Sequence, residues 1–218
     1  MRSELMQLDL KTIFNGNTPL TFLVGAGISM DPPSSLVPAW KIIEAIVQYC
    51  TPEEVAQDIL SGAIAKYLRY EYLLQVFRDN FDPNLKFMEY FELALNPNLI
   101  HGFLADMITK HHSVMTTNFD YLIETALQYH PAVTKDVIKN KSIRLVITED
   151  DFEAYSDHEK NVEDGLLVLY KIHGSLRNLI TEESTRDSII TTLDSIGKGK
   201  EKQEDPLAIP LFKQKLFD

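Results

Sequence analysis

Three short apolar runs, each followed at once by a group of polar residues, constrain the fold of this chain more than any other feature of its sequence. The runs cover residues 20–24, 113–115 and 166–172. Continuous apolar runs bounded by turn residues are typical of strands that are buried on both faces of a parallel sheet. Helical patterns separate the runs, so we expect an α/β fold in which helices cover such a sheet.

Helical patterns dominate the part of the chain between the first and second runs. Residues 40–49 carry isoleucine and valine at helical intervals, and apolar residues recur three and four apart over residues 66–95. A further amphipathic helix is expected after Asn98, before the second run, with Leu99 on its apolar face. The sequence therefore predicts a Rossmann-like parallel sheet flanked by helices, with a helical insertion at about residues 40–95.

Length and composition favour one folded domain over residues 1–218. Of the 218 residues, 44% are hydrophobic and 24% are charged, which is ordinary for a chain that buries a sizeable core. Residues 194–206 are rich in Gly, Lys, Glu and Gln and read as a loop. A doubly wound sheet normally needs a further strand beyond this point, so we expect the chain to be the N-terminal part of a longer protein.

Charge and cysteine content exclude several classes of function. A formal net charge of -11 without a basic patch argues against direct binding of nucleic acid. Cys50 is the single cysteine in the sequence, so these residues can form neither an internal disulfide nor a four-cysteine zinc ribbon. Residues 1–10 lack the apolar core of a secretory signal or a membrane anchor, and we expect a cytoplasmic protein with no membrane association.

The first polar group contains glycines at a strand end. In a parallel sheet the carboxyl ends of the strands meet at one edge, where ligands bind. Glycines there let the backbone approach a pyrophosphate, and exposed amides can donate to it. The third glycine of a dinucleotide fingerprint would fall at Met30, so this group alone is equally compatible with a simple tight turn. The residues concerned are Gly25, Ala26, Gly27 and Ser29.

The second polar group contains Thr117, Asn118 and Asp120. An amide side chain at a strand end can bind a ribose hydroxyl or hold a water beside an anomeric carbon. Taken alone, Asn118 or Asp120 would more commonly cap the helix that we expect over residues 120–128.

The third polar group begins with His173, whose imidazole would lie at the sheet edge and could accept a proton. A lone histidine is more often structural than catalytic, and that alternative stays open. The adjacent His111 and His112 have no carboxylate or thiolate at ligand spacing, so we expect no metal site.

Read together and in order, the three groups, with Pro97-Asn98 and His101 between the first and second, resemble the Sir2 family, especially its bacterial Sir2-like branch. The resemblance spans residues 20–176. It implies that NAD is bound as substrate, that Asn118 and His173 are catalytic, and that His101 packs beneath the site. The NAD-binding residues that it implies are Gly25, Ala26, Gly27, Ser29, Thr117 and Asp120.

Two departures from the deacylases of that family bear on the activity. Residues 37–40, Val-Pro-Ala-Trp, stand where those enzymes carry an Asp-Phe-Arg element, and the four zinc-binding cysteines are absent. The resemblance therefore implies water as the acceptor and an NAD+ hydrolase as the activity, of the kind that depletes NAD in anti-phage defence. Such an effector would form a homo-oligomer and respond to a C-terminal sensor domain or a partner protein.

Two other functions remain open from the sequence. The chain could be a non-catalytic module that senses NAD or ADP-ribose, or an NAD-dependent protein deacylase or ADP-ribosyltransferase. The missing cysteines make deacylation the weakest of these alternatives.

Overall fold

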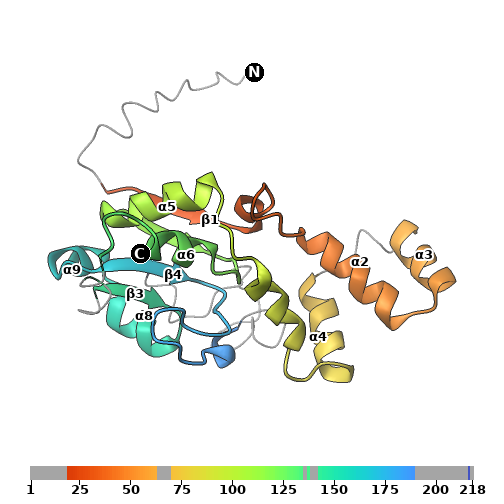
Figure 1. The fold of residues 1–218 in the computed structure, drawn as a ribbon. Helices are drawn as coiled ribbons and strands as arrows, with labels where there is room; N and C mark the ends of the chain where they lie inside the picture. Colours follow the sequence, from red (N-terminus) through yellow and green to blue (C-terminus); the bar gives the residue numbers. More distant parts are fainter. Residues whose placement is uncertain (1–18, 63–69, 135–136, 138–141, 190–215, 217–218) are drawn as a thin grey trace, which may run out of the picture.

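A parallel four-stranded sheet forms the framework of the protein (Figure 1). The computed structural model describes residues 19–62, 70–134, 137, 142–189 and 216. Within these ranges the strands lie in the order β1-β2-β4-β3, which confirms the predicted α/β class. The strands are β1 (Thr21–Val24), β2 (Ser113–Thr116), β3 (Ile143–Val146) and β4 (Leu167–Lys171).

Helices cover both faces of this sheet. Successive side chains of a strand point to opposite faces, so each central strand contributes side chains to the hydrophobic cores on both faces of the sheet. Val114 and Leu169 pack with helices α5 and α6, whereas Met115 and Tyr170 pack on the opposite side with Phe152 of α8. Figure 1 shows α5 and α6 on one side of the sheet and α8 on the other. These helices and their neighbour α9 are α5 (Leu99–Thr109), α6 (Leu122–Gln128), α8 (Glu149–Tyr155) and α9 (His158–Glu163).

A helical region lies between β1 and α5, where the sequence predicted helices. Figure 1 shows α2, α3 and α4 extending to one side of the sheet. The last helix of the region is a 3-10 helix rather than an α-helix. None of the helices in the described part of the chain is long and apolar enough to cross a membrane. The elements are η1 (Ala26–Ser29), α2 (Ala39–Cys50), α3 (Glu53–Ser61), α4 (Tyr70–Asn80) and η3 (Lys86–Leu93).

Asn98 fixes the start of α5. Its side chain accepts hydrogen bonds from the amides of Ile100 and His101, and the His101 ring accepts one from the Asn98 amide. This reciprocal cap satisfies amides that the helix itself leaves without acceptors. At the other end, the ring of His112 accepts a hydrogen bond from the Leu20 amide at 3.1 Å, which ties the end of α5 to the start of β1.

The structure differs from the sequence-based expectations in three places. Strand β3 was not predicted, although residues 143–147 form an apolar run interrupted only by Arg144. The expectation that β1 is buried on both faces was wrong, because β1 is an edge strand of the sheet that the described residues form, and Leu23 is 62% exposed. Leu99 was expected on the apolar face of its helix but is 89% exposed. The loop predicted over residues 194–206 lies outside the described residues.

Two leucines of α5 provide a matched test of this core. Leu104 is fully buried between α5 and the sheet, and replacing it by alanine should lower the free energy of unfolding by about 2–5 kcal/mol, because the substitution leaves a cavity. Leu99→Ala in the same helix should change it by less than about 0.5 kcal/mol. Urea denaturation of both variants measures the difference, and equal effects would contradict the packing described.

Candidate functional site

The carboxyl ends of three strands lie level at one edge of the sheet. Val24 of β1 pairs with Thr116 of β2, and Thr116 pairs with Lys171 of β4. The polar groups that follow these strands therefore start from neighbouring positions. Ala26–Ser29 form the single turn η1, one residue after β1, and residues 117–121 form the connection from β2 to α6.

A cavity of about 110 Å³ opens between this edge and the helical region. Its polar lining consists of the side chains of Ser29, Thr117, Asn118 and Asp120, and the rest of its wall is mainly apolar. A mostly apolar pocket with a few convergent polar groups is typical of small-molecule sites. The remaining lining residues are Ala26, Leu36, Val37, Ala39, Ile42, Phe91 and Phe119.

Ser29, Asn118 and Asp120 form one buried hydrogen-bond network in that lining. The Ser29 hydroxyl donates to Asp120 Oδ2 at 2.9 Å, and Asn118 Nδ2 lies 3.1 Å from Ser29 Oγ and 3.3 Å from Asp120 Oδ2. Since a carboxylate only accepts hydrogen bonds, the group of Asn118 that faces Asp120 must be its NH₂. The orientation of the Asn118 amide is thereby fixed.

His101 of α5 completes the network through its contact with Ser29. Its Nδ1 accepts a hydrogen bond from the Asn98 amide, so the ring proton of the neutral form lies on Nε2 and is donated to Ser29 Oγ, 3.2 Å away. Ser29 then accepts from His101 and Asn118 and donates to Asp120, which uses its full capacity. Burial lowers the pKa of His101, and the nearby Asp120 carboxylate opposes that shift, so the ring is held neutral.

The Oδ1 atom of Asn118 is buried and makes no hydrogen bond with any residue that the structure describes. Asn118 is only 6% exposed and lines the cavity. Leaving a buried carbonyl oxygen without a donor costs about 1–3 kcal/mol. A hydroxyl group or a water molecule in the cavity would supply the missing donor.

The glycine turn approaches the second polar group closely. A Cβ atom on Gly25 would lie 3.2 Å from Thr117 Oγ1, so the turn and residue 117 pack tightly at this point. The Ile28 amide donates to the Gly25 carbonyl at 3.1 Å and closes the turn. The Ala26 and Gly27 amides precede this bond, at the start of a helix, where amides lack intrahelical acceptors and can bind an anion.

His173 lies next to the cavity but is not among the residues that line it. Its half-buried ring packs against Phe119, with 6.1 Å between ring centroids, and Phe119 is part of the wall. The structure thus places five of the predicted site residues in the cavity wall and three close behind it. The five are Ala26, Ser29, Thr117, Asn118 and Asp120, and the three are Gly25, Gly27 and His173.

The turn after His173 is held by Gly174. This glycine has φ +82°, in the left-handed region, and a Cβ atom there would collide with the carbonyl oxygen of Ser188. The next residue, Ser175, donates its amide to Ser188 Oγ at 3.1 Å. Only glycine fits this position, and the direction in which the chain leaves β4 is thereby set.

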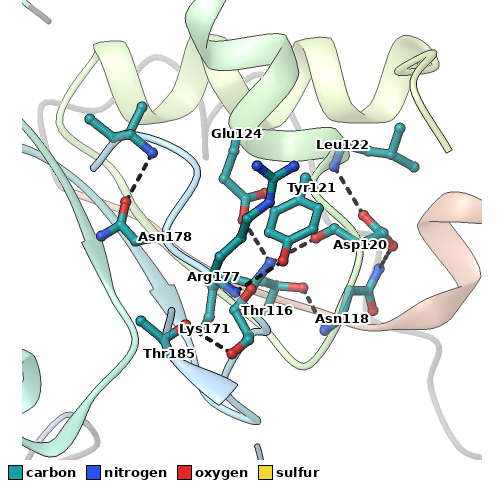
Figure 2. A network of polar contacts seen from close by, with 12 residues as sticks. Thr116, Asn118, Asp120, Tyr121, Leu122, Glu124, Lys171, Arg177, Asn178 and Thr185 are labelled. Atoms are coloured by element: carbon teal, nitrogen blue, oxygen red, sulfur yellow. Dashed lines mark hydrogen bonds and ion pairs between the residues drawn. The ribbon is translucent and has the colours of Figure 1, made fainter. Parts of the chain in front are cut away.

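Sequence reasoning missed a second polar layer behind the cavity, which Figure 2 shows around Tyr121 and Lys171. The buried ammonium group of Lys171 pairs with buried Glu124 at 2.6 Å. The Tyr121 hydroxyl donates to Glu92 of η3 at 3.3 Å, and Arg177 Nε contacts the same carboxylate at 3.1 Å. A lysine in an apolar strand was the available signal for the first pair, whereas the sequence gives no signal for the second.

Asp120 also makes a hydrogen bond at the start of α6, as its interpretation as a helix-capping residue implies. Asp120 Oδ1 accepts a hydrogen bond from the Leu122 amide at 3.1 Å, in the first turn of α6. Its other carboxylate oxygen faces Ser29 and Asn118, so one side chain serves both the helix and the cavity wall. In the part of the chain that the structure describes, no three His, Cys, Asp or Glu side chains gather closely enough to hold a metal ion.

The fold and this edge define a Rossmann-like α/β domain with a candidate nucleotide site. Residues 112–216 match the family model of the SIR2-like domain. This match covers β2, β4 and both the Asn118 and the His173 groups, so this part of the chain is similar to SIR2-like domains. A search of curated proteins found no match.

Replacing Gly174 by alanine should destabilise the protein by at least about 2 kcal/mol, because the added methyl group is strained by the backbone and collides with Ser188. Gly165 is the matched control, since it is also left-handed (φ +67°) but has open space around its Cβ position. Gly165→Ala should cost only about 1 kcal/mol. Thermal and urea denaturation compare the two, and an equal cost would refute the close contact.

The lowered pKa of His101 predicts a pH-dependent stability. The unfolded chain binds a proton on this ring near pH 6.5, whereas the folded protein does so only at lower pH. Protonation therefore favours unfolding, and the free energy of unfolding should fall as the pH drops below about 6.5. His101→Gln removes this titration, so its stability should depend less on pH over that range. Identical pH profiles for both proteins would contradict a buried neutral ring.

Proposed function

We propose that this chain is an NAD+ hydrolase that cleaves the nicotinamide-ribose bond and releases nicotinamide and ADP-ribose. The observation that carries the proposal is the buried Asn118 amide. Its NH₂ group is held by Ser29 and Asp120, and its carbonyl oxygen faces no donor among the described residues of the wall. A ribose hydroxyl or the attacking water would satisfy that oxygen.

Binding of NAD+ would use the three strand ends together. The amides of Ala26 and Gly27, with Gly25 allowing close approach, would hold the pyrophosphate. Thr117 and Asn118 would contact the nicotinamide ribose at the cavity, and Asp120 with Ser29 would hold Asn118 in place. NAD+ is the substrate in this proposal, and no metal takes part in it.

The chemistry requires a bond to a good leaving group to break before water adds. The electron pair of the C1'-N bond leaves with nicotinamide, which becomes neutral, and positive charge develops on the ribose. Water then adds to C1' and loses a proton, so the products are nicotinamide, ADP-ribose and H⁺. Asn118 would orient the ribose and the water. As the charge develops, His173 would accept a proton from a ribose hydroxyl, and the water that adds to C1' would return a proton to that hydroxyl, so the one proton released overall leaves from His173.

A passive NAD or ADP-ribose sensor is the second candidate, and the position of His173 favours it. The imidazole packs against Phe119 behind the wall rather than lining the cavity. Binding without cleavage would need only the glycine turn and the second polar group. Protein deacylation or ADP-ribosyl transfer has less support, because a single cysteine excludes a four-cysteine zinc ribbon within these residues.

The proposal extends to a role in the cell by resemblance to the bacterial Sir2-like branch. There the chain would deplete NAD in the cytoplasm during anti-phage defence. An unregulated NAD+ hydrolase would harm its own cell, so activity would depend on homo-oligomer formation and on a C-terminal sensor domain or a partner protein.

Two alanine variants test the hydrolase. In the full chain, Asn118→Ala and His173→Ala should each lower the rate of nicotinamide release by about 100-fold to 10,000-fold, the range typical of a lost general base or orienting group. His130→Ala is the control, because this partly buried ring contacts the Ala132 amide and lies away from the cavity wall. Chromatography of the products gives the rates.

The outcomes separate the candidates. Unchanged turnover in either variant would remove that residue from the mechanism. Binding of NAD+ by calorimetry with no release of nicotinamide from the wild-type chain would favour the sensor. Transfer of ADP-ribose to a protein, or formation of O-acetyl-ADP-ribose, would favour the third candidate.

A further inference from the structure

Lys171 is a buried cation at the end of an otherwise apolar strand. It is the last residue of β4, and its side chain is completely buried. Its ammonium group lies 2.6 Å from the carboxylate of Glu124, which is also buried, on α6. Taking both charges out of water carries a large desolvation penalty, so such a pair contributes little net stability compared with two apolar side chains of similar volume.

The ammonium group makes a second contact that apolar side chains could not make. Lys171 Nζ donates to the backbone carbonyl of Asp120 at 2.7 Å, and it lies 4.8 Å from the centre of the Tyr121 ring. Glu124, Asp120 and Tyr121 belong to one segment, which leads from β2 into α6. One side chain of β4 therefore binds at two points to the segment that carries the second polar group (Figure 2).

The position of Lys171 links the two parts of the proposed catalytic machinery. It pairs in register with Thr116 of β2, two residues before Asn118, and it lies two residues before His173. The donors of an ammonium group number three. Two of them face the Asp120 carbonyl and Glu124, and the group lies over the Tyr121 ring. Lys171 is not among the residues that line the cavity, so it is not itself placed to contact substrate.

We propose that Lys171 is a positioning residue, which holds the Asn118–Asp120 turn in a fixed place relative to the strand that leads into His173. The carbonyl of Asp120 is the point of attachment, and Glu124 compensates the charge of the ammonium group. Asp120 in turn holds Asn118 Nδ2 at 3.3 Å, so a shift of the turn would move the amide that faces the ribose. The effect on turnover rests on the proposed NAD+ hydrolase activity, whereas the effect on the turn does not.

A pair of variants separates positioning from stability. Lys171→Met with Glu124→Leu removes both charges and the bond to the Asp120 carbonyl, while the volume of the core is kept. This double variant should melt within a few degrees of the wild type, but its kcat for nicotinamide release should fall about tenfold to a hundredfold, with the Kd for NAD+ nearly unchanged. Glu124→Gln keeps Lys171 on the Asp120 carbonyl, so it should melt lower yet retain its kcat.

The exchange rates of backbone amides measure the stability of the Asn118–Asp120 turn without any assay of activity. The Asn118 amide donates to Thr116 Oγ1 at 3.0 Å, and the Leu122 amide donates to Asp120 Oδ1 at 3.1 Å. Both amides should exchange at least about tenfold faster in the double variant, while the β2 amides of Val114 and Met115 should not change. Lys110→Met with Asp106→Leu removes an exposed pair of the same charges on α5 and should alter none of these quantities.

Each result decides the proposal. A double variant with wild-type kcat and wild-type exchange at residues 118 and 122 would overturn it. So would a double variant that does not fold, or a kcat that follows melting temperature in both variants, because the pair would then act through stability alone. If the wild-type chain releases no nicotinamide, the hydrolase fails, but faster exchange at these two amides still supports the positioning role.

Discussion

The level ends of β1, β2 and β4 are the constraint on which the rest of the site depends. Parallel pairing sets Val24, Thr116 and Lys171 side by side, so that the next few residues of three distant segments leave the sheet at one edge. A slip of one residue in this register would turn every side chain of a strand to the opposite face. The cores on both faces oppose such a slip, and in this way the apolar runs fix the positions of the polar groups.

The polar network in the cavity wall extends this constraint to single atoms. The amide of Asn98 determines which nitrogen of His101 carries the proton that is donated to Ser29. Ser29 also accepts a hydrogen bond from Asn118 and donates its own proton to Asp120. Buried polar groups must be matched donor to acceptor, so the chain of contacts has one consistent arrangement. The Asp120 carboxylate decides which atom of Asn118 is left for a ligand, and the helix cap at the start of α5 sets the His101 tautomer that donates to Ser29.

Sequence patterns were sufficient to predict the strands that end in polar groups, but they did not predict the remaining strand or the contacts between distant segments. The apolar run of β4 and the motif at Asn118 are defined by residues that are neighbours in the sequence, so the hydrophobic pattern predicts them well. The edge position of β1 depends on which strands lie beside it, and β3 was missed because Arg144 is the second of its four residues. The contacts of Tyr121 with Glu92 and of Lys171 with Glu124 join segments far apart in the chain, and no spacing rule reports them.

A crystal structure of the chain with ADP-ribose bound would test the central claim most directly, because this product carries both the pyrophosphate and the ribose. The account predicts the pyrophosphate against the amides of Ala26 and Gly27, and a ribose hydroxyl within hydrogen-bond distance of Asn118 Oδ1. ADP-ribose bound elsewhere on the protein, with Asn118 Oδ1 still without a donor, would contradict the account.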